Sequence, residues 1–244
     1  MPSSPEASPR EAAIPPLPVR IAQAFFSPAK LFDALRERPA WIGAVIGLIV
    51  VGVAAQFLTP VLVSEEVLRA MVEAQFERFT PPGADEATQA QIEAQIDATL
   101  ARGPVANSVT AVVATPITLA VISGLLLIAF NVVMGGEARF KQLFSASAHA
   151  LFIYTAGGLV SLVLMAFGSE NPILAPGLFL PEADGFIGNF LNGINVFSVW
   201  TCGVLGVAVS RIYPGRSVAA GTVYLLVLYL MVVAVLAALG SLLG

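Results

Sequence analysis

Apolar residues fall into five long runs along the chain, and none of the five contains Asp, Glu, Lys or Arg. A helix of about 20 apolar residues, at a rise of about 1.5 Å each, crosses a hydrocarbon layer of roughly 30 Å. One charged side chain at its centre would cost about 2.5–3.5 kcal/mol. The pattern therefore predicts five transmembrane helices, at residues 41–63, 105–134, 144–167, 191–210 and 218–243.

The fourth run is the least apolar, because Asn192, Gly193 and Asn195 interrupt its start. The composition also indicates a membrane protein. Of the residues, 57% are hydrophobic and 11% are charged, whereas soluble domains carry roughly 25% charged residues. A soluble chain of 244 residues has too small a core to bury that much apolar surface. The predicted fold class is all-α, a polytopic integral membrane protein that lies in the lipid bilayer.

The basic residues are concentrated on one side of the predicted topology. The segment before residue 41 and the connections 135–143 and 211–217 hold nine of the twelve Lys and Arg residues. The connection 64–104 holds the other three, and 168–190 holds none. Because basic residues are enriched in cytoplasmic connections, we predict a cytoplasmic N-terminus and an outward-facing C-terminus (N-in/C-out).

The segment before the first run has two predicted parts. Residues 1–24 are rich in Pro, Ser and Ala and are expected to form a disordered tail. Residues 25–40 favour an amphipathic helix that begins at Ser27 and Pro28. Its apolar face would carry Leu31, Phe32 and Leu35, and we expect this helix to lie in the cytoplasmic membrane interface. A plain tether is the alternative.

The connection 64–104 is predicted to be an acidic helical hairpin outside the cytoplasm. Apolar residues recur at helical spacing on both sides of the Pro81-Pro82-Gly83 break, and Asp85 can cap the second helix. The two apolar stripes could pack on each other, on the membrane surface or on a partner protein. Mutual packing is favoured.

Little in the chain indicates catalysis or a cofactor. There is one histidine, His149, and one cysteine, Cys202, whereas a zinc site needs three or four ligands. His149 is expected to reach water or to cap a neighbouring helix near the start of the third predicted span. No nucleotide-binding or hydrolase motif occurs. We therefore predict a protein that is not an enzyme, with no catalytic, cofactor or metal site. No basic stripe suited to nucleic acid is present either.

Small residues at four-residue spacing in the predicted spans indicate close helix packing. Such positions occur in the first, third and fourth runs. They are Gly43 and Gly47, then Gly157 and Ser161, and finally Cys202, Gly206 and Ser210.

Three stretches resemble the bacterial branch of the Yip1-domain membrane proteins. They are Phe26–Phe32 with Arg38–Trp41, then Gly135–Gln142 running into Ser145–His149, and Trp200 with Arg211–Ala219. The resemblance implies five spans, a cytoplasmic N-terminus and, for a bacterial member, the cytoplasmic (inner) membrane. Eukaryotic members are associated with Rab-type GTPases and vesicle traffic. Their Asp-Leu-x-Gly-Pro element does not occur here, so that activity is not carried over.

Two functions remain open at this point. The first is a scaffold or partner-binding protein in membrane organisation or trafficking, which docks anionic lipid or an acidic partner on its cytoplasmic side. The second is a transporter or channel subunit with a polar path lined by Asn131, Tyr154 and Asn195. A partner at the acidic hairpin and association with a second copy of the chain are further expectations. The predicted docking residues are Phe26, Lys30, Phe32, Arg36, Arg139, Phe140 and Lys141.

Overall fold

Helices make up the regular structure of the protein. The computed structural model describes residues 14–77, 80, 83–169, 172–180 and 185–243, with no strand among them. The elements in chain order are α1 (Leu17–Phe26), α2 (Pro28–Glu37), α3 (Ile42–Leu62), α4 (Glu65–Glu77), α5 (Glu86–Leu100), α6 (Pro104–Leu127), the π-helix η1 (Ile128–Val133), α7 (Phe140–Ala166), the 3₁₀ helix η2 (Pro176–Phe179), α8 (Gly185–Gly193), α9 (Val196–Ile212) and α10 (Val218–Leu243).

Four of these helical stretches are long and apolar enough to cross a bilayer, namely α3, α6 with η1, α7 and α10. A fifth crossing is available if α8 and α9, which meet at 54°, form one broken span. The protein is therefore an all-α polytopic membrane protein, as predicted. The fourth predicted span, 191–210, is not one straight helix. It divides after Gly193, and the Asn195 side chain caps the start of α9 by accepting a hydrogen bond from the Phe197 N–H at 2.8 Å.

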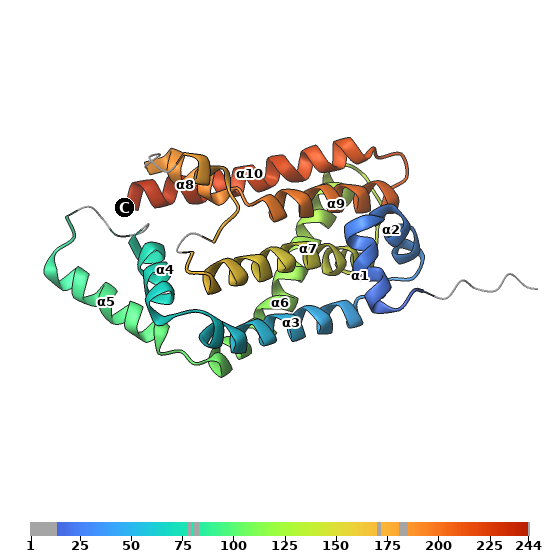
Figure 1. Ribbon diagram of the computed structural model, residues 1–244. Helices are drawn as coiled ribbons and strands as arrows, with labels where there is room; N and C mark the ends of the chain where they lie inside the picture. The colour runs from blue at the N-terminus through green and yellow to red at the C-terminus, as the bar shows by residue number, and fades with distance from the viewer. Residues whose placement is uncertain (1–13, 78–79, 81–82, 170–171, 181–184, 244) are drawn as a thin grey trace, which may run out of the picture.

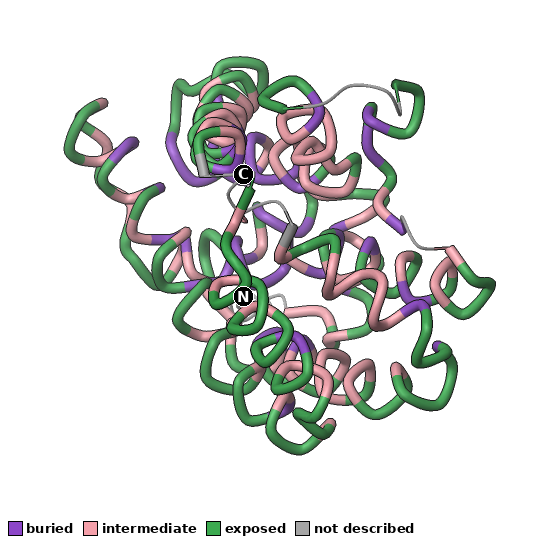
Figure 2. Tube along the Cα trace, turned by 90° about the vertical axis from the view of Figure 1, so that its left-hand side faces the viewer, coloured by how far each residue is buried: buried purple, intermediate pink, exposed green. Residues whose placement is uncertain are grey.

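The long helices run side by side, as Figure 1 shows, with α1 and α2 at one end and the α4–α5 hairpin and the C-terminus at the other. Helix α9 packs on α10, α7 and α2, and α3 packs on α6 and α7. Figure 2 shows buried positions where helices meet and exposed positions on their outward sides. Exposed apolar residues such as Ile46, Val113 and Val235 occupy those outward sides, as expected for helices that face lipid.

The N-terminal segment departs from its prediction in two ways. Residues 17–24 belong to helix α1 and are not disordered, because Leu17, Ile21 and Phe25 pack against buried core residues. Residues 1–13 of the predicted tail lie outside the described part. The apolar face of α2 is also not free for a membrane surface, since Leu31, Phe32 and Leu35 are fully buried in a cluster with Ala208 and Val209 of α9.

Charged side chains join the two helices of the α4–α5 hairpin. Arg69 of α4 pairs with Glu73 on its own helix and with Glu93 and Asp97 of α5. Asp85 caps α5 as predicted, since its carboxylate accepts the Thr88 N–H at 2.8 Å. The apolar stripe of α4 is shared with the long helices, because Val67 packs with Val63 and with Leu162 of α7.

Candidate functional site

Three basic segments that lie far apart in the sequence meet at the α1–α2 end of the molecule. Arg36 Nη1 donates to the Arg211 carbonyl at 3.2 Å, and Gln142 Nε2 donates to the Arg36 carbonyl at 2.7 Å. Arg216 donates to the Met134 carbonyl. The first two bonds join α2 to the end of α9 and to the start of α7. The third joins the α9–α10 connection to the η1–α7 connection.

Asn131, on the π-helix η1, organises this surface from below. Its Nδ2 donates to the Ala138 carbonyl at 2.8 Å, and its Oδ1 accepts the Ala138 N–H at 3.2 Å. The same Oδ1 accepts the Tyr213 hydroxyl at 2.6 Å. Burial raises the pKa of Tyr213 to about 12. A tyrosine phenol is protonated at neutral pH even at its ordinary pKa of about 10, so Tyr213 acts as a donor here. One amide thus fixes two connections relative to each other.

The glycine pair that opens the η1–α7 connection is required by this geometry. Gly135 has φ +70°, a conformation that favours glycine. A Cβ on Gly136 would lie 2.5 Å from the Tyr213 ring and 2.7 Å from the Phe130 carbonyl oxygen. The Gly136 N–H donates to that carbonyl at 2.9 Å. The pair lets the chain turn tightly beneath the tyrosine.

The surface encloses a hollow of about 350 Å³, called the arginine hollow below. Arg36, Arg139 and Arg216 line it together with one acid, Glu137. Guanidinium groups bind carboxylate and phosphate in a planar two-bond geometry. With three cations to one anion, the hollow is suited to an anionic group. Its other lining residues are Gly135, Gly136, Ala138, Gln142, Ile212, Tyr213 and Pro214.

Most of the predicted docking residues are exposed at this end. Phe26 is 81% exposed and Phe140 is 43% exposed, and Lys30, Arg36, Arg139 and Lys141 are also exposed.

Phe32 is the exception and requires a correction. It is 0% exposed within the α2–α9 cluster, so it supports the surface from inside and touches no partner.

Arg216 and Tyr213 line the arginine hollow but were not predicted as site residues. The sequence does carry a feature that could have indicated them, because the short connection 211–217 has two arginines beside a tyrosine.

The predicted glycines lie at helix contacts. A Cβ on Gly47 would lie 3.1 Å from the Phe152 ring of α7, and one on Gly43 would lie 3.7 Å from Arg20 Nη2 of α1. A Cβ on Gly157 would lie 2.6 Å from the Phe197 ring of α9. At the α9–α10 crossing, a Cβ on Gly206 would lie 2.6 Å from the Thr222 backbone nitrogen.

The other small residues of the predicted stripes make hydrogen bonds. Ser161 Oγ donates to the Pro172 carbonyl at 2.8 Å, outside its helix. Ser210 Oγ donates to Val207 of its own helix at 2.8 Å, and the Cys202 thiol lies 3.9 Å from the Leu225 carbonyl of α10. Ser210 therefore makes no hydrogen bond across a helix pair here.

His149 is fully buried, so it does not reach water, the first of its two expected roles; its contact is with a neighbouring helix instead. Arg20 of α1 donates from Nη1 to His149 Nε2 at 3.0 Å and to the Ala40 carbonyl at 2.7 Å. Since arginine can only donate, the histidine proton sits on Nδ1, 2.7 Å from the Ser145 carbonyl. Burial lowers the pKa of Arg20, which nevertheless stays charged. The pair fastens α1 to α7.

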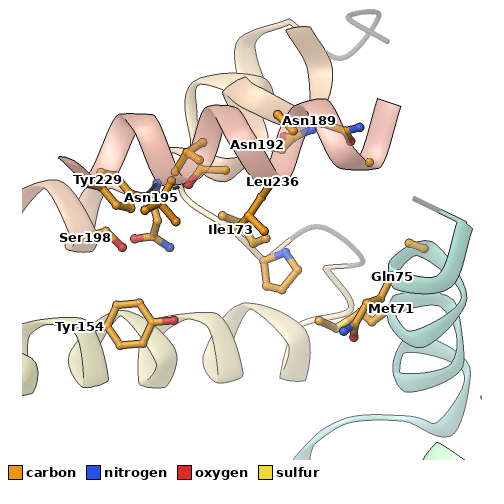
Figure 3. A pocket seen from close by; sticks show the side chains of 17 residues that line it. Met71, Gln75, Tyr154, Ile173, Asn189, Asn192, Asn195, Ser198, Tyr229 and Leu236 are labelled. Atoms are coloured by element: carbon orange, nitrogen blue, oxygen red, sulfur yellow. Dashed lines mark hydrogen bonds between the residues drawn. The ribbon is translucent and has the colours of Figure 1, made fainter. Parts of the chain in front are cut away.

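A second, larger hollow of about 640 Å³ lies at the other end and contains two of the proposed path residues, Tyr154 and Asn195 (Figure 3). Asn131 lies at the arginine hollow instead. Ser198, in the larger hollow, and Ile212, in the arginine hollow, lie fourteen positions apart on α9, which is about 21 Å along a helix. Between them, Val204, Leu205 and Ala208 are buried. The three path residues are not brought together.

The all-helical fold, with its long apolar candidate spans, defines a polytopic helical membrane protein. Among the described residues, no cluster of three His, Cys, Asp or Glu side chains could hold a metal ion. Residues 22–239 match the Yip1 domain, and the chain belongs to the Yip1 family. Comparison with curated proteins and with solved structures gives no match. The family predicted from the three short stretches is therefore confirmed.

Proposed function

We propose that this Yip1-family protein is a non-enzymatic membrane scaffold that binds an acidic segment of a partner protein in the arginine hollow. The observation that carries the proposal is the convergence of Arg36, Arg139 and Arg216 from three separate segments. Hydrogen bonds hold the backbone at each of the three. The Arg36 carbonyl accepts from Gln142 Nε2, and the Arg139 N–H donates to Gln142 Oε1. The Arg216 N–H donates to the Tyr213 carbonyl. A site whose groups are held in place before binding loses less entropy when the partner arrives.

The surroundings of the hollow favour a protein partner. Phe140 is exposed beside Arg139 and Lys141 at the start of α7. Aromatic residues and arginine are enriched where proteins bind each other. An acidic segment with apolar residues would meet both kinds of group.

The proposed setting is the cytoplasmic side of a bacterial inner membrane. It rests on the resemblance to bacterial members and on the gathering of basic residues at the α1–α2 end, since basic residues are enriched in cytoplasmic connections. The transporter or channel alternative is less well supported, because buried α9 residues separate the two hollows.

The test uses the full chain in nanodiscs of uncharged lipid and a fluorescent Glu-rich peptide that contains Phe and Leu. We expect binding by fluorescence anisotropy that weakens about tenfold in the combined Arg36→Gln, Arg139→Gln and Arg216→Gln variant, since exposed charge pairs contribute roughly 0.2–1 kcal/mol each. Arg102→Gln, at the opposite end of the molecule, is the control and should change nothing.

Two outcomes would overturn the proposal. One is equal peptide binding by the wild-type protein and the triple variant. The other is no peptide binding together with arginine-dependent binding of vesicles that contain phosphatidylglycerol, which would make the hollow a lipid site. A thermal unfolding curve of the triple variant excludes misfolding as the cause of lost binding.

A further inference from the structure

The larger hollow, called the neutral hollow below, lies between α7 on one side and α9 and α10 on the other. Helix α8 and the segment at Pro172 and Ile173 bound it, and α4 reaches its rim (Figure 3). Its volume of about 640 Å³ falls within the roughly 300–1,000 Å³ of small-molecule pockets. The three long helices around it are candidate spans or part of the broken span. The neutral hollow therefore lies among membrane-crossing elements.

The break between α8 and α9 brings polar groups into this hollow. Tyr229 of α10 holds the break, because its hydroxyl donates to the Gly193 carbonyl at 2.8 Å and accepts the Asn195 N–H at 3.1 Å. Asn195 and Ser198 then project into the hollow, across from the Tyr154 hydroxyl of α7 (Figure 3). The polar groups thus come from three helices and converge on one region.

Tyr154 is the most informative of these residues. It is the fifteenth of the 27 residues of α7, a candidate span, yet its side chain is 53% exposed. A hydroxyl in hydrocarbon without a hydrogen-bond partner costs free energy. An exposed phenol at the middle of a span is therefore suited to a ligand that offers a hydrogen bond.

The remaining wall is apolar, and charge is missing from the lining. Val232, Val233 and Leu236 of α10 form one side together with Ile173. Among the described residues that line the hollow, none is Asp, Glu, Lys, Arg or His. An ionised headgroup would have no counter-charge here, which is costly at membrane depth. A ligand with an uncharged head and an apolar tail matches both parts of the lining.

We propose that the neutral hollow binds an uncharged amphiphile of the bilayer. Its hydroxyl- or amide-bearing head hydrogen-bonds to Tyr154, Asn195 and Ser198, and its apolar chain lies along Val232 and Leu236 of α10. This site is separate from the docking of an acidic segment at the arginine hollow and does not depend on it.

The test is photolabelling of the full chain in liposomes with a diazirine-bearing monoacylglycerol, followed by peptide mapping. A diazirine phosphatidic acid is the charged comparison probe. We expect the neutral probe to label α7 near Tyr154 and α10 near Val232 at least fivefold above the outward side of α3, and the anionic probe to show no such preference.

Two valines of α10 provide a matched pair of variants. Val232 lines the hollow and is 51% exposed, whereas Val235 is 58% exposed and does not line it. Val232→Trp fills the hollow without entering the core, and should reduce site labelling about fivefold, whereas Val235→Trp should leave it unchanged. Tyr154→Phe should reduce labelling by the monoacylglycerol about threefold, as expected for one lost hydrogen bond.

Three results would overturn the proposal. Labelling could be uniform over all lipid-facing helices, or the phosphatidic acid probe could label the hollow better than the neutral probe. The third is a crosslink between two copies through Val232 and Leu236 that excludes the probe, which would make this face an interface between chains. Thermal unfolding of each variant separates loss of binding from loss of fold.

Discussion

The two hollows lie at opposite ends of the same helices and have opposite chemistry. The arginine hollow carries three guanidinium groups and one carboxylate, whereas the described lining of the neutral hollow has no ionisable group other than tyrosine. Charged side chains are tolerated at helix ends, where water and headgroups solvate them, and are costly between the spans. The comparison shows that the position of each hollow along the helices restricts the kind of ligand it can bind.

The hollows also differ in how they are held. At the arginine hollow, side-chain hydrogen bonds join α2, η1, α7 and the α9–α10 connection. At the neutral hollow, Tyr229 makes the hydrogen bonds that tie α10 to the α8–α9 break. We expect the first to keep its shape and the second to adapt to its ligand.

The largest effect is expected from Asn131→Leu. This substitution removes the two hydrogen bonds to Ala138 and the one to Tyr213. At about 1 kcal/mol net for each bond, we expect a loss of about 3 kcal/mol in the free energy of unfolding. Denaturant unfolding in detergent measures it. Asn107→Leu is the control, since the Asn107 amide reaches Arg102 only at 3.5 Å.

Gly157→Ala should have the next largest effect, and it acts on the neutral hollow. The new Cβ would lie 2.8 Å from the Phe197 Cβ, so α7 and α9 must separate beside Ser198. Overpacking of this kind costs about 1–3 kcal/mol. Gly158→Ala is the matched control, because a Cβ there meets nothing within 4 Å.

Thermal unfolding compares the two alanine variants directly. Equal melting temperatures for Gly157→Ala and Gly158→Ala would contradict the close approach of α7 and α9. In the same pair, only Gly157→Ala should alter labelling of the neutral hollow.

The smallest effect is expected at the hairpin. The Thr88 side chain and N–H lower the pKa of Asp85 below its usual value of 3.8. Because the folded-state pKa is the lower one, the cap stabilises α5 above about pH 4, and this contribution is lost as the pH falls through the folded-state value. Asp85→Ala should remove this pH dependence of the stability of α5. NMR of the Thr88 amide as a function of pH is the measurement.

Much of the fold could be predicted from sequence, because apolar runs without charges must lie in lipid. The position of η1 and the break at Asn195 could not, since both depend on contacts with Tyr213 and Tyr229 far along the chain. Likewise, the amphipathic pattern predicts that Phe32 lies on an apolar helix face. It does not predict that α9 is the helix that buries this face.

Only part of the arginine hollow could be predicted from the sequence. Arg36 and Arg139 were predicted as docking residues from their place beside aromatic residues. The sequence places Arg216 on the basic side of the topology, but nothing near it in the sequence places it next to residues 135–139. Its position depends on the Tyr213–Asn131 hydrogen bond, which joins residues 82 positions apart.

We propose that the two ends of the molecule face different compartments, with the arginine hollow toward the cytoplasm. The most direct measurement is labelling by a membrane-impermeant maleimide in a Cys202→Ala background. Arg139→Cys reports on the arginine hollow, and Gln75→Cys reports on the rim of the neutral hollow. We expect Arg139→Cys to be labelled only in inverted vesicles and Gln75→Cys only in right-side-out vesicles. Labelling of both from the same side, or of Arg139→Cys from outside, would contradict it.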